Sequence, residues 1–410
     1  MADLRTVLMR VSGRDRPGIT TTLLGVVARA GAEIFDMEQV VVRERLTLDI
    51  LLGVADDNDV LKELLYAAWE LGVEAEFEDV EPESARAGLP RYAVTVLGVP
   101  LHAAGLEAVT RTIATAGGNI DRIERLSRYP VVSFEFVVVD GDIDAMRREL
   151  LVVAAAHRLD VAVQPERLER RAKRLVMLDV DSTLIQGEVI NLLAEVAGAG
   201  DEVSAITERA MAGELDFREA LEQRVALLAG TPVSAYDEVW ERLTLTPGAR
   251  TFVRTLKRLG YRVGIVSGGF QAITDRLAAE LDLDHAFANV LEQQDGVLTG
   301  RLGGPVVDRA RKAELLREVA EAAGIPIEQT VAVGDGANDL DMLTAAGLGI
   351  AFNARPVVND VADAALSVPY LDAILFLLGI RREEVERADA ADPNAPTEPP
   401  PPVPGSTPPV

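Results

Sequence analysis

A short apolar run followed by two aspartates most narrows what this chain can fold into. Residues 175–178 are all apolar, and Asp179 and Asp181 come directly after them. A short run that is apolar throughout is typical of a strand buried on both faces of a parallel sheet. Because ligands of open α/β sheets bind beyond the carboxyl ends of such strands, the two carboxylates are expected at a site. Asp before Ser182 is also typical of a helix cap or an Asx-turn. The aspartate pair alone therefore does not distinguish a catalytic site from a turn.

Three later apolar runs predict the rest of this sheet. Residues 263–266, 330–333 and 349–352 alternate with helical stretches, as in a Rossmann-like parallel sheet wound with helices. We therefore expect an α/β domain over 174–386. Apolar residues at helical spacing between the first two strands predict a helical cap over about 188–246, which would cover the active edge of the sheet.

The first part of the chain contains the same order of elements twice. Residues 4–80 and 92–164 both have the pattern of strand, helix, strand, strand, helix and strand. This order predicts two small ferredoxin-like βαββαβ domains over 1–81 and 91–168. The intervening residues are rich in Pro, Gly, Ser and Ala, which is typical of a linker.

Two further segments are expected to be solvated. The basic run at 170–174 leads into the strand before Asp179 and is interpreted as an exposed junction. Nine of the eighteen residues in 393–410 are proline, so we expect a disordered, Pro-rich tail over 388–410.

Composition excludes several classes of function. The formal net charge of -25 argues against binding to nucleic acid or to anionic membranes. The chain has no cysteine, which excludes thiolate chemistry, and its three histidines form no metal-binding motif. No uncharged run approaches the roughly 18 residues of a membrane span, so a cytoplasmic protein is expected.

Three motifs follow the other predicted strands and make phosphate chemistry the favoured interpretation. Ser267, Gly268 and Gly269 form a turn whose hydroxyl and backbone amides suit a phosphate. Lys312 begins a predicted helix and offers a compact positive charge. Residues 334–343 (GDGANDLDML) are rich in carboxylates but lack the closing Glu of a calcium-binding loop.

In this order, the four motifs resemble those of the haloacid dehalogenase superfamily of phosphohydrolases. The resemblance implies that Asp179 attacks phosphorus and forms an aspartyl-phosphate. It implies that Asp181 first protonates the leaving oxygen and then activates water. Ser267 and Lys312 would hold the phosphoryl oxygens.

The same resemblance implies a magnesium ion. Its ligands would be Asp179, the backbone carbonyl of Asp181, and Asp335, and the ion would offset the repulsion between carboxylate and phosphate. Asp339 is expected to orient Lys312 or a metal-bound water rather than bind the metal itself.

Within the superfamily, residues 179–185 (DVDSTLI), followed by Glu188, are similar to the phosphoserine phosphatase family. This implies hydrolysis of phosphoserine in the final step of serine biosynthesis. Glu188 would face the substrate ammonium and Arg224 its carboxylate, while Met211 and Phe217 close over it. The phosphate would contact Ser267, Gly268, Gly269, Lys312 and Asn338.

The turn at residues 13–18 (GRDRPG) resembles the ligand turn of ACT domains, which bind amino acids between paired copies. We therefore expect L-serine as a feedback effector near Asp15 and Gly18, and a homo-oligomer formed through these domains. The equivalent turn at 98–105 departs from the motif. A plain strand-to-helix turn in a dimerisation module remains open for both copies.

Other functions also remain open at this point. The same residues suit a phosphatase acting on another small phosphomonoester, or phosphotransfer to an alcohol. A non-catalytic amino-acid sensor is a third possibility, although the intact Asp179, Asp181, Lys312 and Asp335 argue against it.

Overall fold

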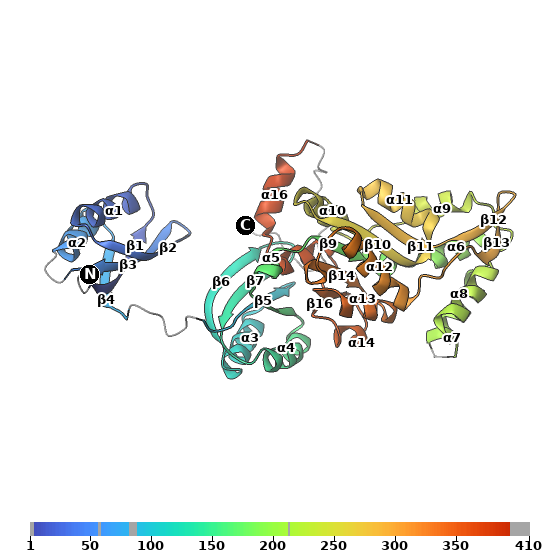
Figure 1. Ribbon diagram of the computed structural model, residues 1–410, viewed down its shortest axis with the longest axis horizontal. Coiled ribbons are helices and arrows are strands. Elements are labelled where there is room, and N and C mark those ends of the chain that lie inside the picture. Colours follow the sequence, from blue (N-terminus) through green and yellow to red (C-terminus); the bar gives the residue numbers. More distant parts are fainter. Residues whose placement is uncertain (1–3, 56–58, 82–87, 212–213, 394–410) are drawn as a thin grey trace. The chain divides into compact units, whose positions relative to one another are not determined.

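The computed structural model describes residues 4–55, 59–81, 88–211 and 214–393 (Figure 1). The chain divides into two compact units, Met1–Gly88 and Leu89–Val410. Most of the predicted linker at 82–90 and most of the predicted tail lie outside the described residues. Among the described residues, no helix has the length and apolar character that crossing a membrane requires.

The first ACT-like domain (residues 4–81) has the predicted βαββαβ order. Its sheet is antiparallel with strand order β2-β3-β1-β4, and both helices pack on one face over Val7, Met9 and Val11. The left-handed Gly31 ends α1, where its N–H bonds to Ala28 O. The elements are β1 (Arg5–Arg14), α1 (Ile19–Ala30), β2 (Glu33–Val42), β3 (Arg45–Val54), α2 (Val60–Glu70) and β4 (Glu74–Asp79).

The second ACT-like domain (residues 91–165) repeats this order. Val94 and Val96 on its central strand pack against the two helices, as Val7 and Met9 do in the first domain. The Asp142 side chain caps α4 by accepting from the N–H groups of Asp144 and Ala145. The elements are β5 (Arg91–Gly98), α3 (Ala103–Thr115), β6 (Asn119–Ser127), β7 (Val132–Val139), α4 (Ile143–His157) and β8 (Asp160–Pro165).

The C-terminal domain (residues 168–393) is the predicted parallel sheet wound with helices. Its strands are β9 (Leu175–Leu178), β10 (Arg262–Phe270), β11 (His285–Asn289), β14 (Thr330–Gly334), β15 (Gly349–Phe352) and β16 (Ala364–Leu366). Strand β9 is central, parallel to β10 and β14, and inaccessible to solvent. The helices outside the cap are α5 (Leu168–Arg171), α10 (Ala249–Arg258), α11 (Gln271–Leu281), α12 (Arg309–Ala322), α13 (Leu340–Ala345), α14 (Pro356–Asn359), α15 (Ile374–Leu377) and α16 (Arg382–Ala390).

The predicted helical cap is present between β9 and β10. Its helices are α6 (Val189–Ala197), α7 (Gly200–Met211), α8 (Phe217–Ala226) and α9 (Ala235–Arg242). Asp216 and Glu219 form a capping box that begins α8. A hairpin of β12 (Leu291–Gln294) and β13 (Val297–Leu302) packs against α8.

The second ACT-like domain and the C-terminal domain share one sheet. Ala162 of β8 pairs with Ala364 of β16, which gives ten strands in the order β11-β10-β9-β14-β15-β16-β8-β5-β7-β6. The face of this ACT-like sheet opposite its helices joins the core of the C-terminal domain through Leu97, Leu126 and Val131. The two domains therefore form one compact unit, which the sequence did not predict.

Two expectations about solvated segments differ from the structure. Arg170 and Lys173 of the basic run are 5% and 6% exposed. Arg170 is buried because it pairs with Glu135 of the second ACT-like domain and with Glu166, which directly follows that domain. The tail boundary at 388 falls inside α16, where Asp389 pairs with Arg254 and Arg258 of α10.

Candidate active site

Asp179 stands at the carboxyl end of the central strand. Its N–H donates to Val333 O, which holds it against the end of β14, and only 3% of the residue is exposed. The chain then turns sharply through Ser182, whose φ of 57° is left-handed. The turn closes with a hydrogen bond from Ser182 N–H to Gly187 O. Asp179 and Asp181 are thereby directed to the same edge of the sheet.

Lys312 reaches this edge from α12 and is fully buried. Its Nζ donates to Asp179 Oδ1 and to Asp339 Oδ1, each at 2.7 Å. Burial alone would lower the pKa of Lys312, but the attraction of the two carboxylates outweighs it and raises the pKa above the usual value. The lysine is therefore a fixed positive charge beside Asp179.

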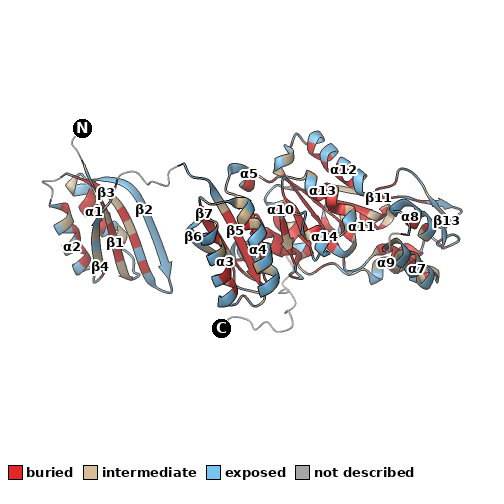
Figure 2. Cartoon of the chain, turned by 90° about the horizontal axis from the view of Figure 1, so that it is seen from below, coloured by how far each residue is buried: buried red, intermediate tan, exposed pale blue. Residues whose placement is uncertain are grey.

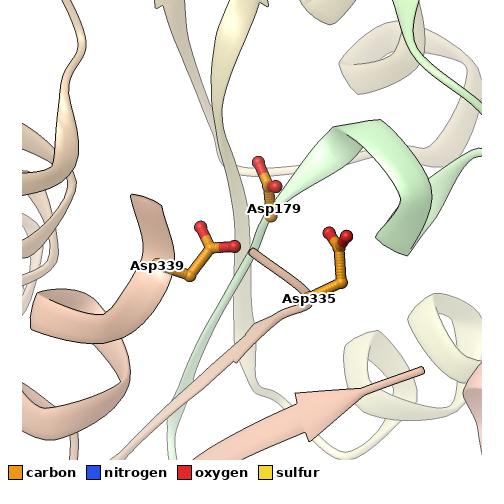
Figure 3. Close-up of side chains that lie close together, drawn as sticks. All are labelled: Asp179, Asp335 and Asp339. Carbon is orange, nitrogen blue, oxygen red and sulfur yellow. The ribbon is translucent and has the colours of Figure 1, made fainter. Parts of the chain in front are cut away.

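The loop after β14 brings Asp335 and Asp339 beside Asp179. Gly334 and Gly336 allow this tight loop, because a Cβ on Gly334 would lie 2.4 Å from Asp339 Cγ. Asp339 is fully buried, and its Oδ2 accepts from Gly336 N–H at 3.0 Å. The side chains of Asp179, Asp335 and Asp339 lie close together (Figure 3). One carboxylate oxygen of each lies within 4.8 Å of the others.

Burial and crowding in this cluster raise the pKa values of Asp179 and Asp335. Burial and then repulsion by Asp339 raise the pKa of Asp335 to about 7. The same two causes raise the pKa of Asp179 well above its ordinary value, although Lys312 opposes them. A divalent cation would relieve this repulsion, and the all-oxygen donor set suits Mg²⁺. Both oxygens of Asp339 already accept hydrogen bonds, so Asp179 and Asp335 are the better placed ligands.

Asp181 links the phosphate turn to the start of the cap. Its Oδ2 accepts from Ser267 Oγ at 2.9 Å, and its Oδ1 accepts from Val189 N–H at 2.7 Å. Ser267 Oγ in turn accepts from Gly269 N–H, and a Cβ on Gly269 would meet both side chains at about 3 Å. Burial raises the pKa of Asp181, and these hydrogen bonds offset the rise only in part. The raised pKa favours a protonated carboxyl, as a general acid requires.

Cap residues line the same cavity, whose volume is about 580 Å³. Phe217, at the start of α8, lies over Gly268, where an added Cβ would be 3.2 Å from its ring. Burial and repulsion by Asp181 raise the pKa of Glu188, while Arg224 and Arg355 oppose the rise. Thus Glu188 shares the cavity above the phosphate turn with the guanidinium groups of Arg224 and Arg355.

The structure places nearly every residue of the predicted site in this cavity. The lining includes Asp179, Asp181, Glu188, Phe217, Arg224, Gly268, Gly269, Asp335 and Asn338, with the buried Ser267, Lys312 and Asp339 directly behind. Met211 ends α7, but the position of its side chain is not described.

Sequence reasoning missed four residues of the site. Asn289 holds the phosphate turn by donating to Gly268 O and accepting from Val307 N–H. Thr183 donates to Asp335 Oδ1 at 3.1 Å, and Arg309 and Arg355 line the cavity. Asn289 and Arg355 come at or just after the ends of parallel strands, the same signal that identified Asp179.

The predicted effector residues lie in the other compact unit. Asp15 and Gly18 belong to the turn between β1 and α1, and Gly18 has a φ of 101° that disfavours any other residue. Asp15 N–H donates to Glu44 O, which ties the turn to the start of β3. A Cβ on Gly18 would contact nothing within 4 Å, so the turn is open at this point.

Comparisons with known proteins agree with this organisation. Residues 173–347 match a haloacid dehalogenase-like hydrolase family, and residues 5–78 and 91–164 each match ACT domains. The chain is 52% identical to a phosphoserine phosphatase of Streptomyces coelicolor, with 95% of each chain covered. It is 51% identical to a phosphoserine phosphatase of Mycobacterium tuberculosis, covering 94% of this chain and 96% of that one.

A solved structure supports the fold. The unliganded crystal structure of a probable phosphoserine phosphatase from Vibrio cholerae superposes with a TM-score of 0.57 at 34% identity, covering 75% of this chain and 91% of that one. Near-complete coverage at about half identity extends to both ACT-like domains as well as to the sheet that holds Asp179. The chain therefore belongs to the phosphoserine phosphatase family, in the form that joins two ACT domains to a haloacid dehalogenase-like hydrolase domain.

Proposed function

We propose that this protein hydrolyses O-phospho-L-serine to L-serine and phosphate, and so completes serine biosynthesis. The proposal rests on the cavity where Asp179, bonded to Lys312, lies beside Asp181, bonded to Ser267. Family membership supports the choice of substrate.

In the first step, Asp179 would attack the phosphorus atom. Its Oδ1 is held by Lys312, which leaves Oδ2 for the attack. As the new P–O bond forms, the bond from phosphorus to the serine oxygen breaks, and Asp181 gives its proton to that oxygen. L-serine leaves, and Asp179 carries the phosphoryl group.

In the second step, water would release the phosphate. Asp181, now a carboxylate, takes a proton from water as the water oxygen attacks phosphorus. The bond from Asp179 to phosphorus breaks, inorganic phosphate leaves, and Asp181 is protonated again. Lys312 and the amides of the Ser267 turn stabilise charge on the phosphoryl oxygens in both steps.

Mg²⁺ is the metal that the donor set favours, with Asp179, the Asp181 carbonyl and Asp335 as proposed ligands. When bound, it would reduce the repulsion between the attacking carboxylate and the phosphate. Thr183 orients Asp335 through its 3.1 Å hydrogen bond, and Asp339 orients Lys312.

Recognition of serine is proposed for the cap. Glu188 would bind the substrate ammonium, and Arg224 its carboxylate as a bidentate fork. Phe217 already covers Gly268 and, together with Met211, would exclude water once substrate is bound.

The test compares phosphate release from phosphoserine with release from other phosphomonoesters, with and without Mg²⁺. Asp179→Asn should reduce turnover by about 10³-fold or more, since the nucleophile is lost. Asp275→Asn, an exposed carboxylate on α11, is the matched control and should keep full activity. Turnover that survives Asp179→Asn would refute the mechanism, and adding alcohol acceptors separates hydrolysis from phosphotransfer.

We also propose that L-serine inhibits the enzyme at the turn that contains Asp15 and Gly18. The open, left-handed Gly18 begins α1, where backbone N–H groups and the helix dipole favour a carboxylate. Gly18→Val should abolish inhibition by serine. Gly31→Val strains the opposite end of the same helix, where φ is 63°, and should leave inhibition intact. Equal inhibition of both variants by serine would exclude this turn as the inhibitory site.

Finally, we propose that two chains associate through the first ACT-like domain. Its edge strand β2 is exposed along its whole length (Figure 2). Apolar side chains on this strand are between 45% and 63% exposed: Ile34, Phe35, Met37, Val40, Val41 and Val42. A long apolar edge with unpaired backbone groups is suited to pairing with a second strand.

A further inference from the structure

A second cavity lies where the second ACT-like domain meets the C-terminal domain. Its volume is about 170 Å³, and we name it the seam cavity. One wall comes from α4 and β8, with Arg147, Leu150 and Val163, and the other from the chain around β16. That second wall contains Val361, Asp363 and Ala365. The cavity is separate from the predicted effector turn, which belongs to the other compact unit.

Its two walls have opposite charges within an aliphatic surface. Arg147 is held on one wall by hydrogen bonds from Nε and Nη2 to Val163 O, at 3.3 and 3.1 Å. These bonds use two of the five N–H donors of the guanidinium. Asp363 is fixed on the other wall, because its Oδ2 accepts from Gly349 N–H at 2.9 Å. A ligand with a carboxylate, an ammonium and a small aliphatic group would match all three features.

The volume of the cavity limits the size of the ligand. A protein cavity of about 150 Å³ holds a benzene molecule, which has six carbon atoms. The seam cavity is slightly larger, so it suits an amino acid the size of valine, which has about eight non-hydrogen atoms. Eight of the ten lining residues are aliphatic, which favours a branched hydrocarbon side chain over a hydroxyl in contact with them.

One short segment borders both this cavity and the active site. Arg355 and Val357 line the active-site cavity, while Val361, Asp363 and Ala365 line the seam cavity. Helix α14 (Pro356–Asn359) joins the two groups. Asp363 also bonds to the first residue of β15, the strand that leads directly to Arg355. A ligand that holds this segment would therefore change the freedom of Arg355 beside Glu188.

We propose that the seam cavity binds a small aliphatic amino acid, and that its occupancy changes the affinity of the active site for substrate. The binding does not depend on the proposed function, whereas the effect on the active site does. The transmission runs through Arg355, which lines the active-site cavity and acts on the charge of Glu188, the proposed partner of the substrate ammonium. The expected effect is consequently on KM, with kcat unchanged.

Isothermal titration calorimetry of the full chain with L-valine tests the binding. L-valine should bind, and isovalerate or isobutylamine, which lack the ammonium or the carboxylate, should bind at least about tenfold more weakly. Arg147→Gln should abolish binding, and Arg148→Gln, its exposed neighbour on α4, should not. Ala365→Leu fills the cavity and provides an independent variant if Arg147→Gln does not fold.

Two results would overturn the proposal. One is the absence of binding heat with L-valine, and the other is binding that both Arg147→Gln and Ala365→Leu leave unchanged. Kinetics with phosphoserine then test the coupling: L-valine should shift KM severalfold, and an unchanged KM despite binding would exclude transmission to the active site. Because calorimetry needs no turnover, a chain inactive on phosphoserine would refute the proposed function without affecting the test of this site.

Discussion

The two ACT-like domains have the same order of elements but opposite relations to the rest of the chain. The first forms a compact unit of its own, whereas the second shares a sheet and a core with the C-terminal domain. The contrast is clearest at two equivalent strand positions. Arg10 pairs in register with Asp49 in the first domain, and Thr95 pairs in register with Glu135 in the second.

These equivalent pairs have different surroundings. Arg10 and Asp49 form an ion pair on the surface of their own sheet. Glu135 is 4% exposed, and its partner is Arg170, at the start of the C-terminal domain. Thus a sheet face that is solvated in one copy has become an internal interface in the other. The same fold serves as a separate module once and as part of the catalytic unit once.

The edge strands differ in the same way. Strand β2 of the first domain is exposed along its length, and six of its ten side chains are apolar. Its counterpart β6 carries charged side chains that pair with α16, as Glu124 does with Arg381 and Arg125 with Glu383. An edge whose charged side chains pair within their own chain is less suited to pairing with a second strand than an exposed edge with many apolar side chains.

Truncation should give the largest difference between the two ACT-like domains. A chain that begins at Leu89 should fold and keep its turnover, because this unit is compact without the first domain. A chain that also lacks the second domain, beginning at Leu168, should be insoluble or unfolded, because Leu97, Leu126 and Val131 belong to the core that would be opened. Circular dichroism and activity measure the outcome. A soluble, active shorter chain would show that the shared core is dispensable.

Arg170→Met should cost about 3–5 kcal/mol of stability, since Glu135 would remain buried without its ion-pair partner. Differential scanning calorimetry of the full chain should show this loss in the transition of the larger unit. Arg10→Met, at the exposed pair of the first domain, is the control and should leave both transitions unchanged. Similar effects of the two substitutions would contradict the difference in burial.

Gln164→Leu should lower the free energy of unfolding by about 1–3 kcal/mol. Gln164 Nε2 donates to Leu377 O across the interface, and the substitution leaves that carbonyl buried without this donor. Glu78 occupies the equivalent position on β4, where it pairs with Leu8 as Gln164 pairs with Ala93. Urea unfolding should show no such loss of stability for Glu78→Leu. A similar loss of stability for both variants would contradict the difference between the two ACT-like domains.

Val41→Lys should have the smallest effect, confined to self-association. A lysine on the exposed β2 edge should weaken the dimer by about tenfold, or about 1.4 kcal/mol, without loss of turnover. Ile123→Lys on β6, where the native side chain is 54% exposed, should not change the oligomeric state. Sedimentation velocity measures both, and a monomeric wild-type chain would remove the basis of this prediction.

Local patterns predicted the elements of the fold well. Periodicity in the sequence indicated both βαββαβ domains, the parallel sheet and the cap, because each pattern depends on neighbours close in the chain. Burial of Arg170 was not predictable in this way. Its partner Glu135 is 35 residues away, on a strand whose alternation is the same whether its outer face is solvated or covered.

The candidate site was predictable to a similar degree. Asp179, Ser267 and Asp335 follow apolar strands, so topology alone brings them together. Asn289 was missed because it supports the phosphate turn through backbone atoms, and a lone Asn at the end of a strand has no distinctive spacing. Arg355 also follows a parallel strand, but it lies three residues beyond the end of β15 and outside any recognisable motif.

The bridge between β8 and β16 also has a consequence for synthesis of the chain. Strand β16 has three residues and would form the last edge of the parallel sheet. On the ribosome, the second ACT-like domain is complete before any strand of that sheet emerges, since domains fold in order from the N-terminus. When β16 forms, its outer side can therefore pair with β8, which is already folded. The nascent chain can close its sheet against its own second ACT-like domain, before another nascent chain can pair with the open edge.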